Sequence, residues 1–121
     1  MRGHRDLVVW QKAMILVTDI YQATREFPKD EVYGLRAQLR RAAVSVPSNL
    51  AEGHGRNSRR EFHQFIGNAR GSLTEVETQI EIAKKSRLRE TSSRCGTFIQ
   101  ASEVARMLNG LRKWSETVYD R

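Results

Sequence analysis

The chain has 121 residues, of which 21 are Lys or Arg and 14 are Asp or Glu, so its formal charge is +7. A hydrophobic content of 39% lies in the globular range, and 2 prolines with 8 glycines exclude a disordered or collagen-like chain. The length allows one hydrophobic core but not two, so we expect a single domain over residues 1–121.

The expected location is the cytoplasm. The longest stretch without a charged residue, Ala42–Ala51, is far shorter than the ~20 apolar residues of a membrane span. Near the N-terminus only Leu7–Trp10 forms an apolar run, which is too short for a signal peptide. Cys95 is the single cysteine, so no internal disulfide can form and nothing indicates an oxidising compartment.

The first expected helix spans residues 7–26. Proline disfavours helical geometry in the residue before it, so Phe27-Pro28 should end this helix. The apolar side chains recur at steps of three and four, the period of one helix face: Trp10, Ala13, Val17, Ile20, Thr24 and Phe27.

The second expected helix spans residues 31–53. Asp30 and Glu31 place acidic side chains at its positive end, and the two glycines of Gly53-His54-Gly55 favour a helix stop. Its core stripe consists of Leu35, Leu39, Ala42, Val46 and Leu50.

Pro47 lies inside this second helix, where it removes the N–H that would reach the carbonyl of Ala43 and should kink the chain. The neighbouring Ser45, Ser48 and Asn49 should serve backbone groups that the kink frees. A polar pocket is the other interpretation of these residues.

The third expected helix spans residues 59–88, and the fourth spans residues 92–118. Ser58 and Glu61 are three residues apart and form a capping box at the start of the third helix. The third stripe contains Phe62, Phe65, Ile66, Ala69, Leu73, Val76, Ile80 and Ala83. The fourth contains Phe98, Ala101, Ala105, Leu108, Leu111, Ser115 and Val118. No segment has a strand pattern, so the sequence predicts an all-α, antiparallel up-and-down four-helix bundle.

A second set of small or apolar residues lies opposite the core stripes, where a monomeric bundle would normally carry charge. Its members are Val8, Ile15, Ala37, Val44, Ala51, Gly67 and Gly71. Each helical glycine costs about 1 kcal/mol relative to alanine, and close approach of another helix would explain that cost. We therefore expect a homo-oligomer with these residues at its interface. The alternative is an ordinary surface, because scattered exposed apolar residues need no explanation.

No catalytic or cofactor motif is present in the sequence. His4, His54 and His63 lack the spacing of metal ligands, and no glycine-rich phosphate loop follows a strand. Glu52 and His54 could in principle do acid–base chemistry, but they point to different sides of a helix. We therefore predict no enzyme activity, no catalytic residue, no metal and no cofactor, with an enzyme using Glu52 and His54 as a distant third hypothesis.

The positive charge is concentrated in residues 31–60, which carry six basic and two acidic residues. Sixteen of the 21 basic residues are arginine, whose planar guanidinium suits a phosphate backbone. The sequence therefore predicts a contact surface for RNA or DNA; a solvated face is the alternative. The candidate residues are Arg36, Arg40, Arg41, Arg56, Arg59 and Arg60.

Seven short strings along the chain form a recognisable pattern. They are Leu7-Val-Val-Trp-Gln-Lys-Ala13, Phe27-Pro28, Tyr33-Gly34-Leu35, Gln38-Leu-Arg-Arg-Ala42, Ser45-Val-Pro-Ser-Asn-Leu-Ala-Glu-Gly53, Gly55-Arg56 and Ala69-Arg-Gly-Ser-Leu-Thr-Glu75. The pattern resembles the small four-helix-bundle proteins encoded in intervening sequences of bacterial large-subunit ribosomal RNA genes. It covers about residues 7–83, and its fifth string is the most specific.

The resemblance implies an antiparallel four-helix bundle that assembles as a ring-like homopentamer, with no known catalytic residues. A more distant relative is the accessory protein of diversity-generating retroelements, a basic pentamer thought to bind nucleic acid and a reverse transcriptase. Our first hypothesis is thus a non-enzymatic homo-oligomer, a pentamer as the resemblance implies, that binds an RNA or DNA backbone with low sequence specificity. The second is an interaction scaffold for an acidic protein or a polymerase.

Overall fold

The computed structural model describes residues 3–29, 34–86, 101 and 103–113. Within these ranges lie α1 (Val8–Ala23), α2 (Leu35–His54), α3 (Arg59–Lys85) and a fourth helix over residues 103–113, with residue 101 also helical. The same ranges contain no strand. The predicted all-α helical bundle is confirmed.

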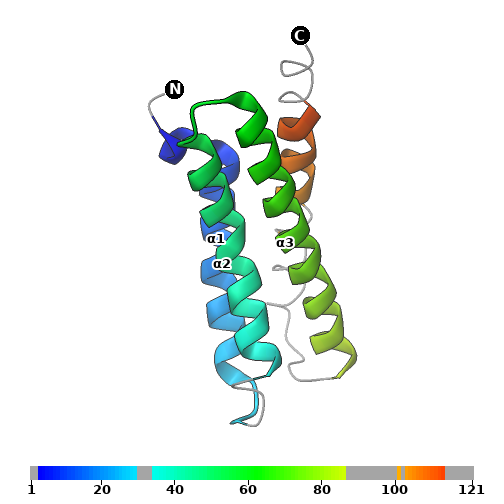
Figure 1. Cartoon of the computed structure of the whole chain (residues 1–121). Helices are drawn as coiled ribbons and strands as arrows, with labels where there is room; N and C mark the ends of the chain where they lie inside the picture. Colours follow the sequence, from blue (N-terminus) through cyan, green and yellow to red (C-terminus); the bar gives the residue numbers. More distant parts are fainter. Residues whose placement is uncertain (1–2, 30–33, 87–100, 102, 114–121) are drawn as a thin grey trace.

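Successive helices run up and down in Figure 1, so that parts distant in sequence meet at the two ends. We call the upper end the region where the start of α1, the turn between α2 and α3, and the end of helix 103–113 meet. At the lower end, the last turn of α1 lies beside the start of α2 and the last turns of α3. The α2–α3 turn and the C-terminal end of the fourth helix therefore share one end of the molecule.

One continuous core joins all four helices. Its fully buried large side chains include Leu16, Leu50, Ile66, Leu73 and Leu108. The stripes of α2 and α3 agree with the sequence, with Leu35, Phe62 and Phe65 only partly buried.

Of the six residues expected in the stripe of the first helix, four are buried, namely Ala13, Ile20, Thr24 and Phe27. The other two, Trp10 and Val17, are partly buried, and Val9 and Leu16 are buried instead, so the buried face of α1 is turned slightly from the expected one.

The helix ends show the predicted local signals with shifted boundaries. Phe27 is extended (φ −63°, ψ 145°), as a residue before proline requires, and a short 3-10 helix at Thr24–Glu26 closes α1. The second helix begins at Leu35 rather than at residue 31, and residues 30–33 lie outside the described ranges. At the start of α3 the Glu61 N–H donates to Ser58 Oγ at 3.1 Å, which confirms the Ser58 half of the predicted capping box. The Glu61 carboxylate lies near Arg56.

Pro47 is buried within α2, and its polar neighbours form a small network. Asn49 Nδ2 donates to the Ser45 carbonyl at 2.8 Å and to Ser45 Oγ at 2.9 Å. Ser45 Oγ and Ser72 Oγ are 2.7 Å apart. All of these hydrogen bonds involve Ser45. None of them reaches the carbonyl of Ala43, which lacks its usual donor because residue 47 is proline. The contact between Ser45 and Ser72 joins α2 to α3.

Gly53 is the point of closest approach between α2 and α3. A Cβ added there would overlap Phe65 Cβ and lie 3.1 Å from Phe65 Cγ and 3.2 Å from Phe62 Cδ1. We expect Gly53→Ala to lower the free energy of unfolding by about 1–2 kcal/mol, after alanine's better helix propensity is counted. Urea unfolding measures this change. Gly110→Ala is the control, because no described atom lies within 4 Å of its Cβ position; equal behaviour of the two variants would contradict the close contact.

Candidate nucleic-acid interface

The six candidate arginines occupy the two ends of the bundle. Arg36, Arg40 and Arg41 lie in the first two turns of α2, at the lower end, whereas Arg56 and the arginines that begin α3 lie at the upper end. At 1.5 Å per residue the three lower arginines lie about 20 to 27 Å from the upper end of α2. One continuous arginine patch, as the sequence suggested, is therefore not what the fold presents.

Arg40 is turned toward α1 and fixes the lower end. Its Nε donates to Thr24 Oγ1 at 2.9 Å and its Nη2 donates to the Tyr21 carbonyl at 3.0 Å. The guanidinium also lies over the Tyr21 ring, 4.4 Å from the centroid. Burial lowers the pKa of Arg40, and the charges of Arg36 and Arg25 lower the pKa further while Tyr21 raises it. These contacts assign Arg40 a structural role.

Arg40→Met should therefore destabilise the fold. Methionine keeps much of the aliphatic stem but removes the charged donor to the buried Thr24 hydroxyl and to the Tyr21 carbonyl. That carbonyl keeps the longer bond from Thr24 Oγ1, at 3.3 Å. We expect a loss of about 1–2 kcal/mol in the free energy of unfolding, because bonds to a charged donor are strong but this site is only partly buried. Arg41→Met, one residue along on an exposed position, should stay within about 0.5 kcal/mol of the parent protein. Similar losses in both variants would contradict this role.

At the upper end Arg56 lies between two carboxylates. Its Nη2 is 3.7 Å from Glu52 Oε2 and its Nε is 3.9 Å from Glu61 Oε2, and all three side chains are about half exposed. Its guanidinium lies 5.1 Å from the centroid of the Phe65 ring. The turn thus holds three arginines against two glutamates and keeps a net positive charge.

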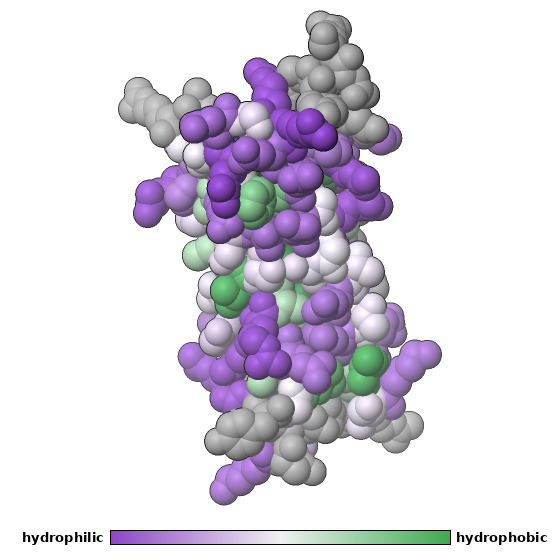
Figure 2. Space-filling view, in the orientation of Figure 1, coloured by the Kyte–Doolittle hydropathy of each residue, from purple (hydrophilic) through white to green (hydrophobic). Residues whose placement is uncertain are grey.

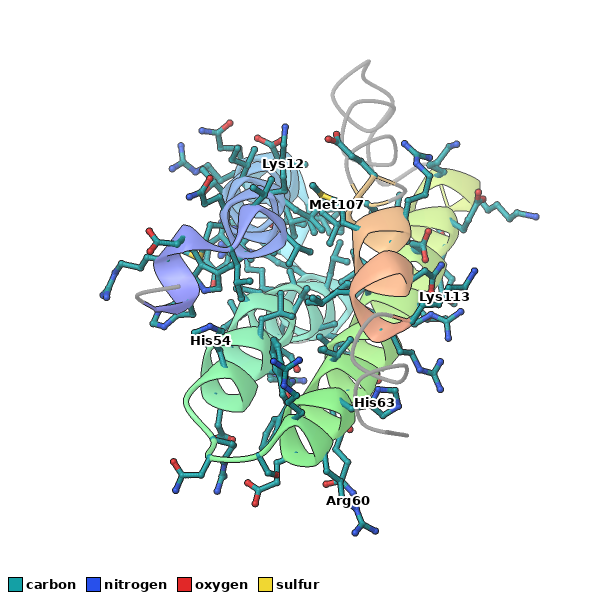
Figure 3. The ribbon with its side chains drawn as sticks, turned by 90° about the horizontal axis from the view of Figure 1, so that it is seen from above. Lys12, His54, Arg60, His63, Met107 and Lys113 are labelled. Carbon is teal, nitrogen blue, oxygen red and sulfur yellow. The ribbon has the colours of Figure 1, made fainter. Side chains whose placement is uncertain are left out.

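A wider basic surface extends from this turn along α3. Arg60, His63 and Arg70 recur at helical spacing with Gly67 between the last two, so they follow one flank of α3. Beyond them Arg70, Asn109, Arg112 and Lys113 line a depression of about 430 Å³ between α3 and helix 103–113. No acidic residue is among the described residues that line it. Figure 3 shows Arg60, His63 and Lys113 on the side where these two helices lie.

We define the upper basic surface as the arginines and the lysine of this region together with His63: Arg59, Arg60, His63, Arg70, Arg112 and Lys113. Four of these residues, His63, Arg70, Arg112 and Lys113, were not among the nucleic-acid contacts predicted from the sequence. Residues 61–90 are electrically neutral by count, and the charge becomes local only because Arg70 packs beside residues more than thirty-five positions later. The helical spacing of Arg60, His63 and Arg70 is the sequence signal that could have indicated this basic flank of α3.

Comparison with known proteins supplies the family. A model of the family described as 23S rRNA-intervening sequence protein matches residues 5–110. The chain belongs to this family. A crystal structure of a protein with unknown function from the S23 ribosomal protein family of Bacteroides thetaiotaomicron has a TM-score of 0.78 at 18% identity, and the match covers 88% of this chain and 99% of that one. At this identity the likeness shows the fold alone. Comparison with curated proteins gives no match.

In this intervening-sequence family member the predicted interface residues are accessible from outside. Val8, Ile15 and Val44 are 54%, 48% and 39% exposed. Gly71 is exposed as well, and Ala37, Ala51 and Gly67 are half-buried. Figure 2 shows a paler band between two hydrophilic regions on the face formed by α2 and α3. Ile15 instead lies beside Glu103 and Val104, so the seven residues form two surfaces rather than one.

The remaining polar candidates of the intervening-sequence protein are engaged separately. Glu52 pairs with Arg56, whereas the His54 ring packs edge-to-face on Phe62 with centroids 5.7 Å apart. No three His, Cys, Asp or Glu side chains come together as a metal site would need, as far as the described ranges reach. Over the same ranges no helix has the length and apolar content of a membrane span.

Proposed function

We propose that this protein is a non-enzymatic homo-oligomer that binds an RNA or DNA backbone with low sequence specificity, through the upper basic surface. The position of Arg59 and Arg60 carries the proposal. They are the first two residues of α3, where the helix dipole favours anions and disfavours cations by about 0.3–1 kcal/mol each. A bound phosphate would offset the unfavourable interaction between these arginines and the positive end of the helix, since helix N-termini bind anions.

The rest of the surface supports the same ligand class. Arg70, Arg112 and Lys113 project from two helices around one depression, which suits the repeated charges of a phosphate backbone. Nothing in this arrangement selects base pairs, so backbone contacts would dominate the affinity. A nucleic-acid ligand agrees with the cytoplasmic location that the sequence predicts.

Glycine at positions 67 and 71 supports the homo-oligomer. No described atom lies within 4 Å of a Cβ built at either residue, so packing among the described residues gives no reason for glycine. A ring, such as the pentamer that the family resemblance implies, needs two different surfaces that fit each other. The apolar Val8 and Ile15 on α1 and the small residues of α2 and α3 are candidates for these surfaces. A ring would also repeat the upper basic surface and raise affinity through multivalency.

Salt dependence tests the proposal directly. We expect structured RNA to bind at about 50 mM salt, with a log–log slope of affinity against salt of about −3.5 to −4.5 if five cations each neutralise about one phosphate. Filter binding over a salt series measures the slope. A slope near zero, or no binding at about 50 mM salt, would contradict nucleic-acid binding and favour a scaffold for an acidic protein or a polymerase.

A further inference from the structure

A pocket of about 400 Å³ opens at the upper end, next to the upper basic surface. Its floor comes from all four helical regions: Leu7 before α1, Gly53 at the end of α2, Phe62 on α3 and Leu111 on helix 103–113. Its rim is the α2–α3 turn, including Asn57 and Arg59. The pocket therefore has an apolar interior beside polar and cationic groups.

The absence of a side chain at Gly53 leaves the Phe62 and Phe65 rings close against the α2 backbone. The His54 and Phe62 rings are perpendicular, with an interplanar angle of 89°. Phe62 is half-buried and lines the apolar floor, so its ring is a candidate stacking platform for a flat aromatic group. The amide of Asn57 at the rim has both a donor and an acceptor for the polar edge of such a group.

We infer that this pocket receives one unpaired nucleobase of an RNA or DNA strand whose phosphates lie on the upper basic surface. The inference rests on the proposed function. Charge decides the occupant, because Arg59 belongs both to the pocket rim and to the upper basic surface. A nucleotide joins a flat aromatic base to a phosphate across a short sugar, which matches an apolar floor containing Phe62 with Arg59 at its rim.

The first test compares a labelled oligoadenylate with an abasic strand that carries the same number of phosphates, by fluorescence anisotropy at low salt. Stacking of one base predicts that the oligoadenylate binds about tenfold more tightly. Leu111→Trp fills the pocket floor and should remove this difference while the abasic strand binds as before. Ile82→Trp is the matched control, because Ile82 is 47% exposed near the other end of α3.

The outcomes separate the two proposals. Failure of both strands to bind the parent protein would overturn the proposed function. Equal binding of both strands, or an unchanged preference in Leu111→Trp, would overturn the nucleobase pocket and leave backbone binding intact. A change of oligomeric state in Leu111→Trp, with the base preference unaltered, would show that a second copy of the chain uses the pocket.

A further measurement needs no variant. A fluorescent adenine analogue within the strand should become less accessible to quenching by acrylamide when the parent protein binds. Binding without any loss of accessibility would overturn the inference even if Leu111→Trp does not fold.

Discussion

Arg59→Glu combined with Arg60→Glu is expected to weaken RNA binding by about 100-fold at about 50 mM salt, and to make the salt slope shallower by about 2. Two phosphate contacts are lost, and two carboxylates then face the backbone. The fold should not suffer, because acidic residues in the first turn of a helix are stabilising by about 0.3–1 kcal/mol each. Anisotropy with labelled RNA measures the affinity, and urea unfolding measures the stability.

The matched control is Arg36→Glu with Arg41→Glu at the lower end. Each Arg→Glu exchange lowers the charge by two, so both double variants fall from +7 to +3. Arg36 is the second residue of α2, and Arg41 is exposed, so this pair resembles the first in setting while leaving Arg40 untouched. Equal loss of affinity in the two variants would contradict a role for the upper basic surface and indicate a dependence on total charge.

Local signals in the sequence predicted the helices well, because each acts over a few residues. The Ser58 cap and the extended Phe27 before Pro28 are both present in the structure. The rotation of α1 was not predictable in this way. Val9 and Leu16 form a stripe as regular as that of Trp10 and Val17, and only the position of the neighbouring helices buries one of them.

The candidate site was harder to predict, because the charge of a residue does not show where its side chain points in the fold. Arg40 is one of six arginines in its part of the sequence, yet it bonds Tyr21 and Thr24 across the contact between α1 and α2. Arg70 and Lys113 are remote in sequence, and the packing of α3 against helix 103–113 brings them to one depression. Counting charges along the sequence therefore identified the upper arginines as candidate contacts. It also included Arg40, which has a structural role, and it missed Arg70.

Gly67→Gln combined with Gly71→Gln is expected to weaken self-association at least about tenfold, because a long side chain at a close helix contact costs about 1–3 kcal/mol. The isolated subunit should become more stable, since glutamine is a better helix former than glycine by about 0.5 kcal/mol per position. Sedimentation equilibrium measures the association, and urea unfolding at low protein concentration measures the subunit. If Gly67 and Gly71 lie at an interface, the double variant should associate more weakly while its isolated subunit becomes more stable.

Gly110→Gln distinguishes this interface from a general effect of glycine replacement. Gly110 is exposed on helix 103–113 with no described atom within 4 Å of its Cβ position, as for Gly67 and Gly71, but it lies outside the predicted interface. It should raise subunit stability without changing association. If the parent protein sediments as a 13.9 kDa monomer at tens of micromolar, or if Gly110→Gln and the double variant alter association alike, the small-residue surface of α3 is not where copies of the chain meet. Because the described part of the subunit gives no packing reason to keep two glycines one turn apart, association is the physical explanation that these measurements test.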